Sequence, residues 1–175
     1  CNNLGRTGTA TETLEGTQVV IDAAIEHGIT FFDVADLYGA RPGLSETLLG
    51  QALGKRRVDV IIGTKFGLPV GDLNGQDFNA RGSRRYIRKA VVGSLERLGT
   101  DYIDLYQFHS PDPATPIAET LGALGDLVDE GLVRYVGHSN HSGWQIADAE
   151  ASAVHTKHRF ISAQNEYSLL HRIAE

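Results

Sequence analysis

Short apolar stretches alternate along the chain with longer stretches in which apolar and polar positions are mixed. The short stretches are rich in β-branched and aromatic residues, which is typical of buried strands. In the longer stretches apolar residues recur every three or four positions, as they do on one face of a helix. We predict strands at 29–34, 58–64, 102–108, 132–137 and 160–163. Residues 1–15 are polar and read as the remnant of an earlier strand followed by a loop.

Helices are predicted between these strands, and capping residues mark their ends. The helical ranges are 17–27, 45–53, 83–98, 116–130 and 142–154. We expect Thr17 and Thr115 to act as N-caps, with Pro116 at a first helical position. Ser142 and Gln145 have the spacing of a capping box. The glycines that follow the first four ranges suit helix C-termini; they are Gly28, Gly54, Gly99 and Gly131.

A regular alternation of strand and helix predicts parallel strands with helices packed outside them. The one long interruption is residues 66–82, which carry four glycines and no helical period. We expect this segment to be a long loop, and long loops in compact domains are usually functional or mobile. The whole of 1–175 is predicted to be one domain.

Composition narrows the classes of protein to which the chain can belong. The hydrophobic content of 41% and the charged content of 22% are those of an ordinary globular protein. A formal net charge of −6 disfavours nucleic acid as a partner. We expect the basic runs at 55–57 and 81–89 to be solvated surface. A single cysteine and the lack of a long apolar run favour a cytoplasmic protein without a membrane segment.

Polar side chains stand where each predicted strand ends. They are Asp33, Lys65, His109, Ser139 with Asn140, and Gln164, and Tyr38 lies in the loop after the first strand. In a parallel barrel the carboxyl ends of all strands lie on one face, so these residues can converge although they are distant in sequence. Any one of them alone would be read as a surface residue, but five successive strands ending in this way indicate a site.

The ionisable members of this set are suited to giving a proton to a carbonyl oxygen. A tyrosine phenol has an ordinary pKa near 10, and we expect the ammonium group of Lys65 to lower the pKa of Tyr38. Asp33 would hold that ammonium in place, and His109 would polarise the carbonyl or assist proton transfer. The neutral groups of Ser139, Asn140 and Gln164 suit hydrogen bonding to a carboxamide such as that of nicotinamide.

Several motifs resemble those of the aldo-keto reductase family, and they keep the order and spacing of that family over nearly the whole chain. They are FFDVADLYG, SETLLGQAL, IIGTK, YIDLYQFHSPDP, VGHSN and SAQNEYSLL. The resemblance is closer to the bacterial and channel β-subunit branches than to aldose reductases. It implies a (β/α)8 TIM barrel, of which this chain would cover roughly strands 1–6 and lack the last βα units.

The resemblance also implies a reaction and a cofactor. It assigns Tyr38 as the general acid, tuned by Lys65 and Asp33, and gives His109 the role of orienting a small carbonyl substrate. Ser139, Asn140 and Gln164 would hold the nicotinamide of NADP(H). The implied activity is reduction of an aldehyde or ketone to an alcohol.

Two departures from the family pattern leave alternatives open. His138 stands where the family usually has an aliphatic residue, and we expect it to be packing or surface. A barrel of this kind needs about 250 residues, so we expect 175 residues alone not to form a stable, active monomer. The alternatives to an active reductase are a reductase-like regulatory or scaffold subunit that binds cofactor with little turnover, and a barrel fragment that assembles with copies of itself.

Overall fold

Five parallel strands form one curled sheet in the computed structural model, which describes residues 1–154 and 156–172. The strands lie in chain order, each paired with the next in sequence. Their bounds are β1 Phe31–Asp33, β2 Ile61–Phe66, β3 Ile103–Phe108, β4 Val133–Ser139 and β5 Ala163–Gln164. The predicted parallel βα arrangement is therefore confirmed.

Five α-helices separate the strands or flank them. They are α1 Leu14–Glu26, α2 Leu44–Leu53, α3 Arg84–Leu98, α4 Ile117–Asp129 and α5 Gly143–Ala153. Ser142 and Gln145 form the predicted capping box at α5. The predicted N-cap of α1 was wrong: Thr13 caps this helix, and its side chain accepts a hydrogen bond from the Gly16 N–H. Thr17 is buried one turn later, and its hydroxyl donates to the Thr11 carbonyl.

Three other boundaries differ from those predicted. The first residues of the predicted strand 58–64 lie in a 3₁₀ helix, η1 Gly54–Asp59, so that β2 begins later and includes Lys65. Pro116 is the N-cap of α4 rather than its first residue, because the Thr115 hydroxyl donates to the Asp112 carboxylate. The strand predicted at 160–163 is β5, which begins only at Ala163.

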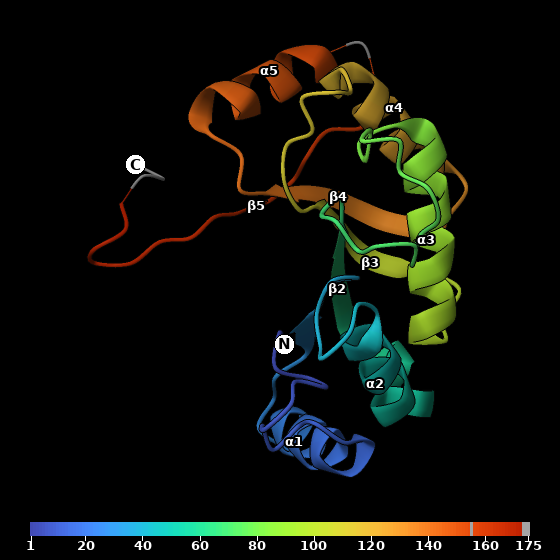
Figure 1. Ribbon diagram of the computed structural model, residues 1–175, viewed down its shortest axis with the longest axis vertical. Coiled ribbons are helices and arrows are strands. Elements are labelled where there is room, and N and C mark those ends of the chain that lie inside the picture. The colour runs from blue at the N-terminus through green and yellow to red at the C-terminus, as the bar shows by residue number, and fades with distance from the viewer. Residues whose placement is uncertain (155, 173–175) are drawn as a thin grey trace.

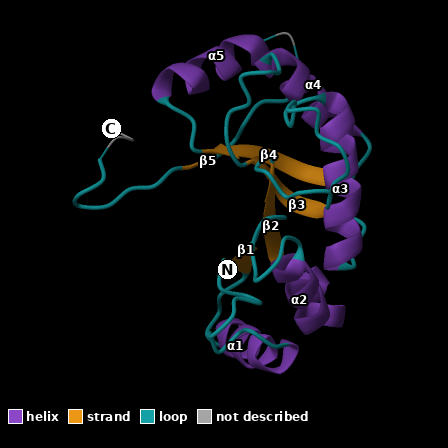
Figure 2. Ribbon diagram, viewed as in Figure 1, coloured by secondary structure: helices purple, strands orange, loops and turns teal. Residues whose placement is uncertain are grey.

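The helices lie along the convex side of the curled sheet, which has the form of part of a barrel (Figure 1; Figure 2). Register fixes which side chains share the opposite, concave face. Asp33, Gly63, Leu105 and Tyr135 are successive Cα partners across four strands. The neighbouring side chain Phe31 and the side chain of Tyr135 are 45% and 58% exposed on this face. The concave face is thus open to solvent, and the carboxyl ends of the strands lie along one edge of it.

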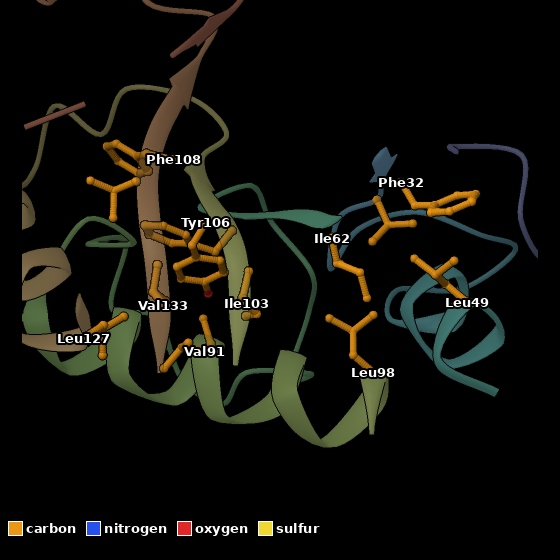
Figure 3. Packing of buried hydrophobic residues seen from close by; sticks show 14 of the residues in the cluster. Phe32, Leu49, Ile62, Val91, Leu98, Ile103, Tyr106, Phe108, Leu127 and Val133 are labelled. Atoms are coloured by element: carbon orange, nitrogen blue, oxygen red, sulfur yellow. The ribbon is translucent and has the colours of Figure 1, made fainter. Parts of the chain in front are cut away.

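The hydrophobic core fills the layer between the sheet and the helices. Phe32 and Ile62 point from the strands toward Leu49 of α2 and Leu98 of α3, and Tyr106 packs near Val91 (Figure 3). The rings of Phe66 and Tyr106 stack with their centroids 4.7 Å apart. This layer fixes the strands against the helices and so fixes the positions of the strand ends.

One member of the basic run at 55–57 is not solvated surface, contrary to the prediction. Arg57 is buried, and its guanidinium donates to the carbonyls of Val60 and Tyr102 and to the Asp104 carboxylate at 2.7 Å. The same carboxylate oxygen accepts the backbone N–H of Ile62. Arg57 therefore joins η1, β2 and β3 at the amino ends of the strands.

The helices of the described residues include none with both the length and the apolar character that crossing a membrane requires.

Candidate active site

The side chains predicted at the strand ends gather at the carboxyl edge of the sheet. Asp33 ends β1, Ser139 ends β4 and Gln164 ends β5, while His109 directly follows β3. Register places Lys65 beside Gln107 and Ser139 beside Gln164. Because the strands are parallel and in register, these residues reach the same edge from segments far apart in the chain.

A buried ion pair lies at the centre of this edge. The Lys65 Nζ donates to Asp33 Oδ2 at 2.6 Å and to the Val34 carbonyl at 3.1 Å. The Lys65 side chain is 1% exposed and the Asp33 side chain 20%. Burial lowers the pKa of Lys65, whereas the attraction of Asp33 opposes that shift. The pairing therefore keeps a charged ammonium in a place where burial alone would favour the neutral amine.

Two glutamine side chains complete the hydrogen bonds of the Asp33 carboxylate. Gln107 Nε2 donates to Asp33 Oδ1 at 3.1 Å, and Gln164 Nε2 donates to Oδ2 at 3.3 Å. Gly63 lies beside this carboxylate, and a Cβ atom there would stand 3.4 Å from Oδ1 and 3.0 Å from the Phe31 ring. With Lys65, three donors from β2, β3 and β5 fix the orientation of Asp33.

Tyr38 lies against this ion pair. The Lys65 Nζ is 5.0 Å from the centroid of the Tyr38 ring, and the His109 ring meets that ring edge-on at 5.7 Å between centroids. Backbone bonds hold the tyrosine: its N–H donates to the Ala35 carbonyl, and its carbonyl accepts the N–H of Ser45 in α2. The structure therefore brings Asp33, Tyr38, Lys65 and His109 together, as the sequence predicted.

The expected direction of the Tyr38 pKa shift was wrong. Burial and the negative charges of Asp33 and Asp36 raise the pKa of Tyr38 above its ordinary value. The Lys65 ammonium is hydrogen-bonded to Asp33 and Val34, and burial together with the two carboxylates outweighs its attraction for a phenolate. The phenol consequently keeps its proton throughout the neutral range, and a proton is always present for transfer.

His109 is a neutral imidazole in this setting. It is 6% exposed, and its Nδ1 has no hydrogen-bond partner among the described residues. Burial and the nearby positive charge of Lys65 lower the pKa of His109 to about 4. A neutral ring carries one N–H, which is able to donate to an oxygen placed between His109 and Tyr38.

The three predicted carboxamide-binding residues form a linked group beside His109. The Ser139 hydroxyl donates to the Gln164 carbonyl at 2.6 Å, and Asn140 Nδ2 donates to the His109 carbonyl at 2.8 Å. Asn140 has a φ of 58°, in the left-handed region, which turns its side chain back toward β3. Within the described chain, the side-chain carbonyl oxygens of Asn140 and Gln164 accept no hydrogen bond, so they are free to accept from a carboxamide N–H.

His138 packs beside this group rather than entering it. Its ring is buried 4.6 Å from the His141 ring and 5.1 Å from the Phe160 ring, between centroids. Burial lowers the pKa of His138 to about 4. We expected His138 to be either a packing residue or a surface residue, and the structure shows that it is a packing residue.

A cavity adjoins the site on the side of α5. Its volume is about 610 Å³, and its walls include Phe108, Ser110, Asn140, His141 and Trp144. Trp144 is 70% exposed there. Neither Tyr38 nor Lys65 lines this cavity, so it extends the site without containing the ion pair.

Two residues that touch the site were not predicted from the sequence. Gln107 is the register partner of Lys65, and it lies two positions before His109. Because side chains alternate between the two faces of a strand, the sequence could have placed Gln107 on the same face as His109. Asp36 is buried beneath the loop that carries Tyr38. Nothing in the local sequence separates this carboxylate from an ordinary loop residue.

Comparisons with known proteins identify relatives of this chain. Residues 3–175 match the pattern of the Aldo/keto reductase family. The chain is 41% identical over 165 residues to the uncharacterized oxidoreductase YrpG of Bacillus subtilis, covering 89% of this chain and 50% of that protein. It is 41% identical over 157 residues to the probable aldo-keto reductase 1 of Glycine max, covering 89% of this chain and 43% of that protein.

A third relative is an aldo-keto reductase of Fusarium vanettenii, 38% identical over 185 residues, with 92% of this chain and 49% of that protein covered. The chain thus spans about half the length of the curated relatives that it matches.

Proposed function

Because this chain belongs to the aldo/keto reductase family, whose fold is the (β/α)8 barrel, we propose that it acts in the NADP(H)-dependent reduction of aldehydes or ketones to alcohols. One observation carries the proposal. The buried Lys65–Asp33 pair, at 2.6 Å, lies against Tyr38 and next to a neutral His109.

Tyr38 is the general acid in this proposal. A carbonyl oxygen between the Tyr38 hydroxyl and the His109 ring would take the phenolic proton as negative charge develops on it. His109 donates its N–H to the same oxygen and polarises the carbonyl before transfer. The phenolate left on Tyr38 is stabilised by the Lys65 ammonium, which Asp33 keeps charged.

The residues beside His109 fit a nicotinamide. A carboxamide offers an NH₂ group and a carbonyl, and the free acceptor oxygens of Asn140 and Gln164 match the NH₂ group. Ser139, Asn140 and Gln164 would hold the ring, and the bound cofactor supplies the hydride. The preference for NADP(H) over NAD(H) rests on the family.

The decisive test is loss of NADPH absorbance in the presence of several aldehydes and ketones near neutral pH. Tyr38→Phe removes only the proton donor, so it should abolish carbonyl-dependent oxidation of NADPH and leave NADPH binding intact. Tyr102→Phe is the matched control, because that ring lies against Arg57 and Arg134 at the amino end of β3.

The outcomes separate the candidate functions. Carbonyl-dependent turnover lost only in Tyr38→Phe supports the reductase. Tight NADPH binding with no turnover of any carbonyl compound would instead favour a regulatory or scaffold subunit. Material that is only multimeric and binds no cofactor would favour a self-assembling fragment.

A further inference from the structure

Asp36 is a fully buried carboxylate that the proposed proton transfer does not use. It lies two residues before Tyr38 and is 0% exposed. Its Oδ2 accepts a hydrogen bond from Asn74 Nδ2 at 2.8 Å, and its Oδ1 has no partner among the described residues. A carboxyl group buried with so few partners favours its neutral form, so Asp36 is mainly the protonated acid near neutral pH.

The backbone of Asp36 joins the two segments that carry the acid and its ammonium neighbour. Its N–H donates to the Lys65 carbonyl at 3.1 Å, and its carbonyl accepts the Gly43 N–H at 2.6 Å. Gly43 is the N-cap of α2, and the second residue of this helix, Ser45, holds the Tyr38 carbonyl. Asp36 is therefore the point at which β2, the Tyr38 segment and α2 are joined.

The side chain of Asp36 adds a third connection, to the long loop. Asn74 lies in that loop, is 4% exposed, and shares its Nδ2 with the Tyr86 hydroxyl of α3 at 3.3 Å. The loop as a whole runs from Gly67 to Ser83, and Phe78 within it is 64% exposed. The Asp36–Asn74 bond thus fastens a segment with exposed parts to the buried floor of the site.

The charges that surround Asp36 come from four elements. Glu46 of α2 is 0% exposed and takes hydrogen bonds from Thr64 and from Arg97 of α3, each at 2.6 Å. The other ionisable neighbours are Lys65 of β2, Tyr86 of α3, Tyr106 of β3 and Tyr38 itself. Burial and Glu46 raise the pKa of Asp36 to about 8, while Asn74 and Arg97 oppose the rise.

The negative charge of Asp36 changes the pKa of two site residues. Its charge raises the pKa of Tyr38 and of Lys65, adding to the effect of Asp33 on the phenol. Asp33 faces the concave side and is paired with Lys65, whereas no cation of the described residues is hydrogen-bonded to Asp36. Asp36, with a pKa of about 8, is ionised in the alkaline range in which Tyr38 titrates, so its negative charge then opposes ionisation of the phenol.

We propose that Asp36 is a positioning residue of this site, which fastens the loop 67–83 to the Tyr38 segment through Asn74 and, in its ionised form, opposes ionisation of the Tyr38 phenol. The meaning of this role for catalysis rests on the proposed function. The structural link and the effect on the phenol do not, and they are measurable without turnover.

Two substitutions separate the two parts of the role. Asp36→Asn removes the charge but keeps an oxygen that is able to accept from Asn74. Asn74→Ala removes the bond to the loop but keeps the carboxylate. Asp101→Asn is the control, since it alters an exposed carboxylate just before β3, at the amino ends of the strands and remote from Tyr38.

The first readout is titration of Tyr38, followed by NMR in protein labelled at the tyrosine Cζ, with Tyr38→Phe identifying its signal. Asp36→Asn should move the Tyr38 midpoint down by about one pH unit, because an adjacent negative charge has been removed. Asn74→Ala and Asp101→Asn should not lower it. An unchanged midpoint in folded Asp36→Asn would overturn the charge effect.

The second readout is cleavage by chymotrypsin after Phe78. Asn74→Ala should speed this cleavage about tenfold, because losing one buried hydrogen bond costs about 1–1.5 kcal/mol, whereas Asp36→Asn and Asp101→Asn should change it little. Equal rates in Asn74→Ala and the unaltered protein would overturn the link to the loop. If both readouts respond but no variant reduces a carbonyl compound, the positioning role stands and the proposed reductase function fails.

Discussion

At the scale of single residues, the site depends on a lysine that is charged in a place from which water is excluded. Lys65 is 1% exposed, and its ammonium is matched by one carboxylate and one carbonyl. Removing one partner of a buried pair leaves the other charge uncompensated. The lysine therefore serves both the chemistry proposed here and the order of the strand ends.

Lys65→Met should lower carbonyl reduction by about a hundredfold to ten-thousandfold, because the phenolate on Tyr38 then forms without an ammonium beside it. The pH at which turnover is fastest should also shift. Turnover measured across a pH series tests this. Lys89→Met, at an exposed position of α3, should leave the rate unchanged. Near-normal turnover in Lys65→Met would contradict the assigned role.

The sequence predicted the site residues better than it predicted their partners. Ionisable groups at strand ends are visible in the sequence because each follows an apolar run, and Asp33, Lys65 and His109 were found in this way. The pKa of Tyr38 was predicted in the wrong direction, since it depends on burial and on Asp36. Burial of a loop carboxylate is decided by packing between elements, which local sequence does not record.

At the scale of elements, the amino ends of the strands are joined by one buried arginine. Arg57 reaches β2 and β3 from η1 through four acceptors, including the Asp104 carboxylate. Its neighbour Arg56 instead pairs with Asp22, and these side chains are 36% and 53% exposed. Adjacent residues of one basic run thus have opposite environments.

Arg57→Ala should destabilise the protein by about 3–5 kcal/mol, because it leaves Asp104 without its cation at a site from which water is largely excluded. Arg56→Ala, the matched control, should cost less than about 1 kcal/mol, as exposed pairs do. Urea unfolding of both variants provides the comparison. Similar losses in the two would show that Arg57 is as solvated as the sequence suggested.

Element types were predictable from the sequence, whereas several boundaries were not. Helices that end at glycine, such as α3 at Gly99, were found because the left-handed C-cap suits that residue. The start of β2 was misplaced, because Val58 and Asp59 look like a strand locally but are held in η1. Arg57, two positions from the end of η1, bonds to the Val60 carbonyl and to β3, and these tertiary contacts favour the 3₁₀ turn.

The buried His138 of β4 makes the free energy of unfolding depend on pH. The pKa of His138 is about 4 in the folded protein and near 6.5 when unfolded. Between these values the unfolded chain binds more protons, so the contribution of His138 is complete above pH 6.5 and is lost as the pH falls toward 4. Asp36, whose pKa is raised to about 8, has the opposite pH dependence. The contribution of His138 is therefore isolated by comparing the protein with a variant that lacks this histidine.

The difference in unfolding free energy between the protein and His138→Phe should therefore change with pH. Relative to the variant, the unaltered protein should lose up to about 3 kcal/mol between pH 6.5 and pH 4, since one pKa unit is worth about 1.4 kcal/mol. Urea titrations at several pH values measure this. A difference that stays constant across the range would mean that His138 titrates normally in the folded state.

At the scale of the whole molecule, the two faces of the sheet differ in what covers them. The convex face is packed by helices, and Phe32 is 2% exposed there. Phe31, its neighbour in β1, points to the concave face and is 45% exposed. Two adjacent phenylalanines therefore report on the two faces separately.

Phe32→Ala should cost about 3–5 kcal/mol, because it opens a cavity in the packed layer. Phe31→Ala should cost much less, about 1 kcal/mol, since this ring already meets solvent. Equilibrium unfolding of the two variants tests the assignment of the faces. Equal costs would mean that the concave face is covered in solution.

The order of the strands also divides the site by how readily its parts open. Lys65 and His109 come from β2 and β3, whose backbone groups are paired on both sides, whereas Gln164 ends the two-residue strand β5, which pairs with β4 alone in the described sheet. Outer strands open with less free energy than inner ones, so their amide protons exchange first. Asp33 ends β1, the other outer strand of the described sheet, so local fraying would release the Asp33 carboxylate and the Gln164 side chain that donates to it before it reaches Lys65.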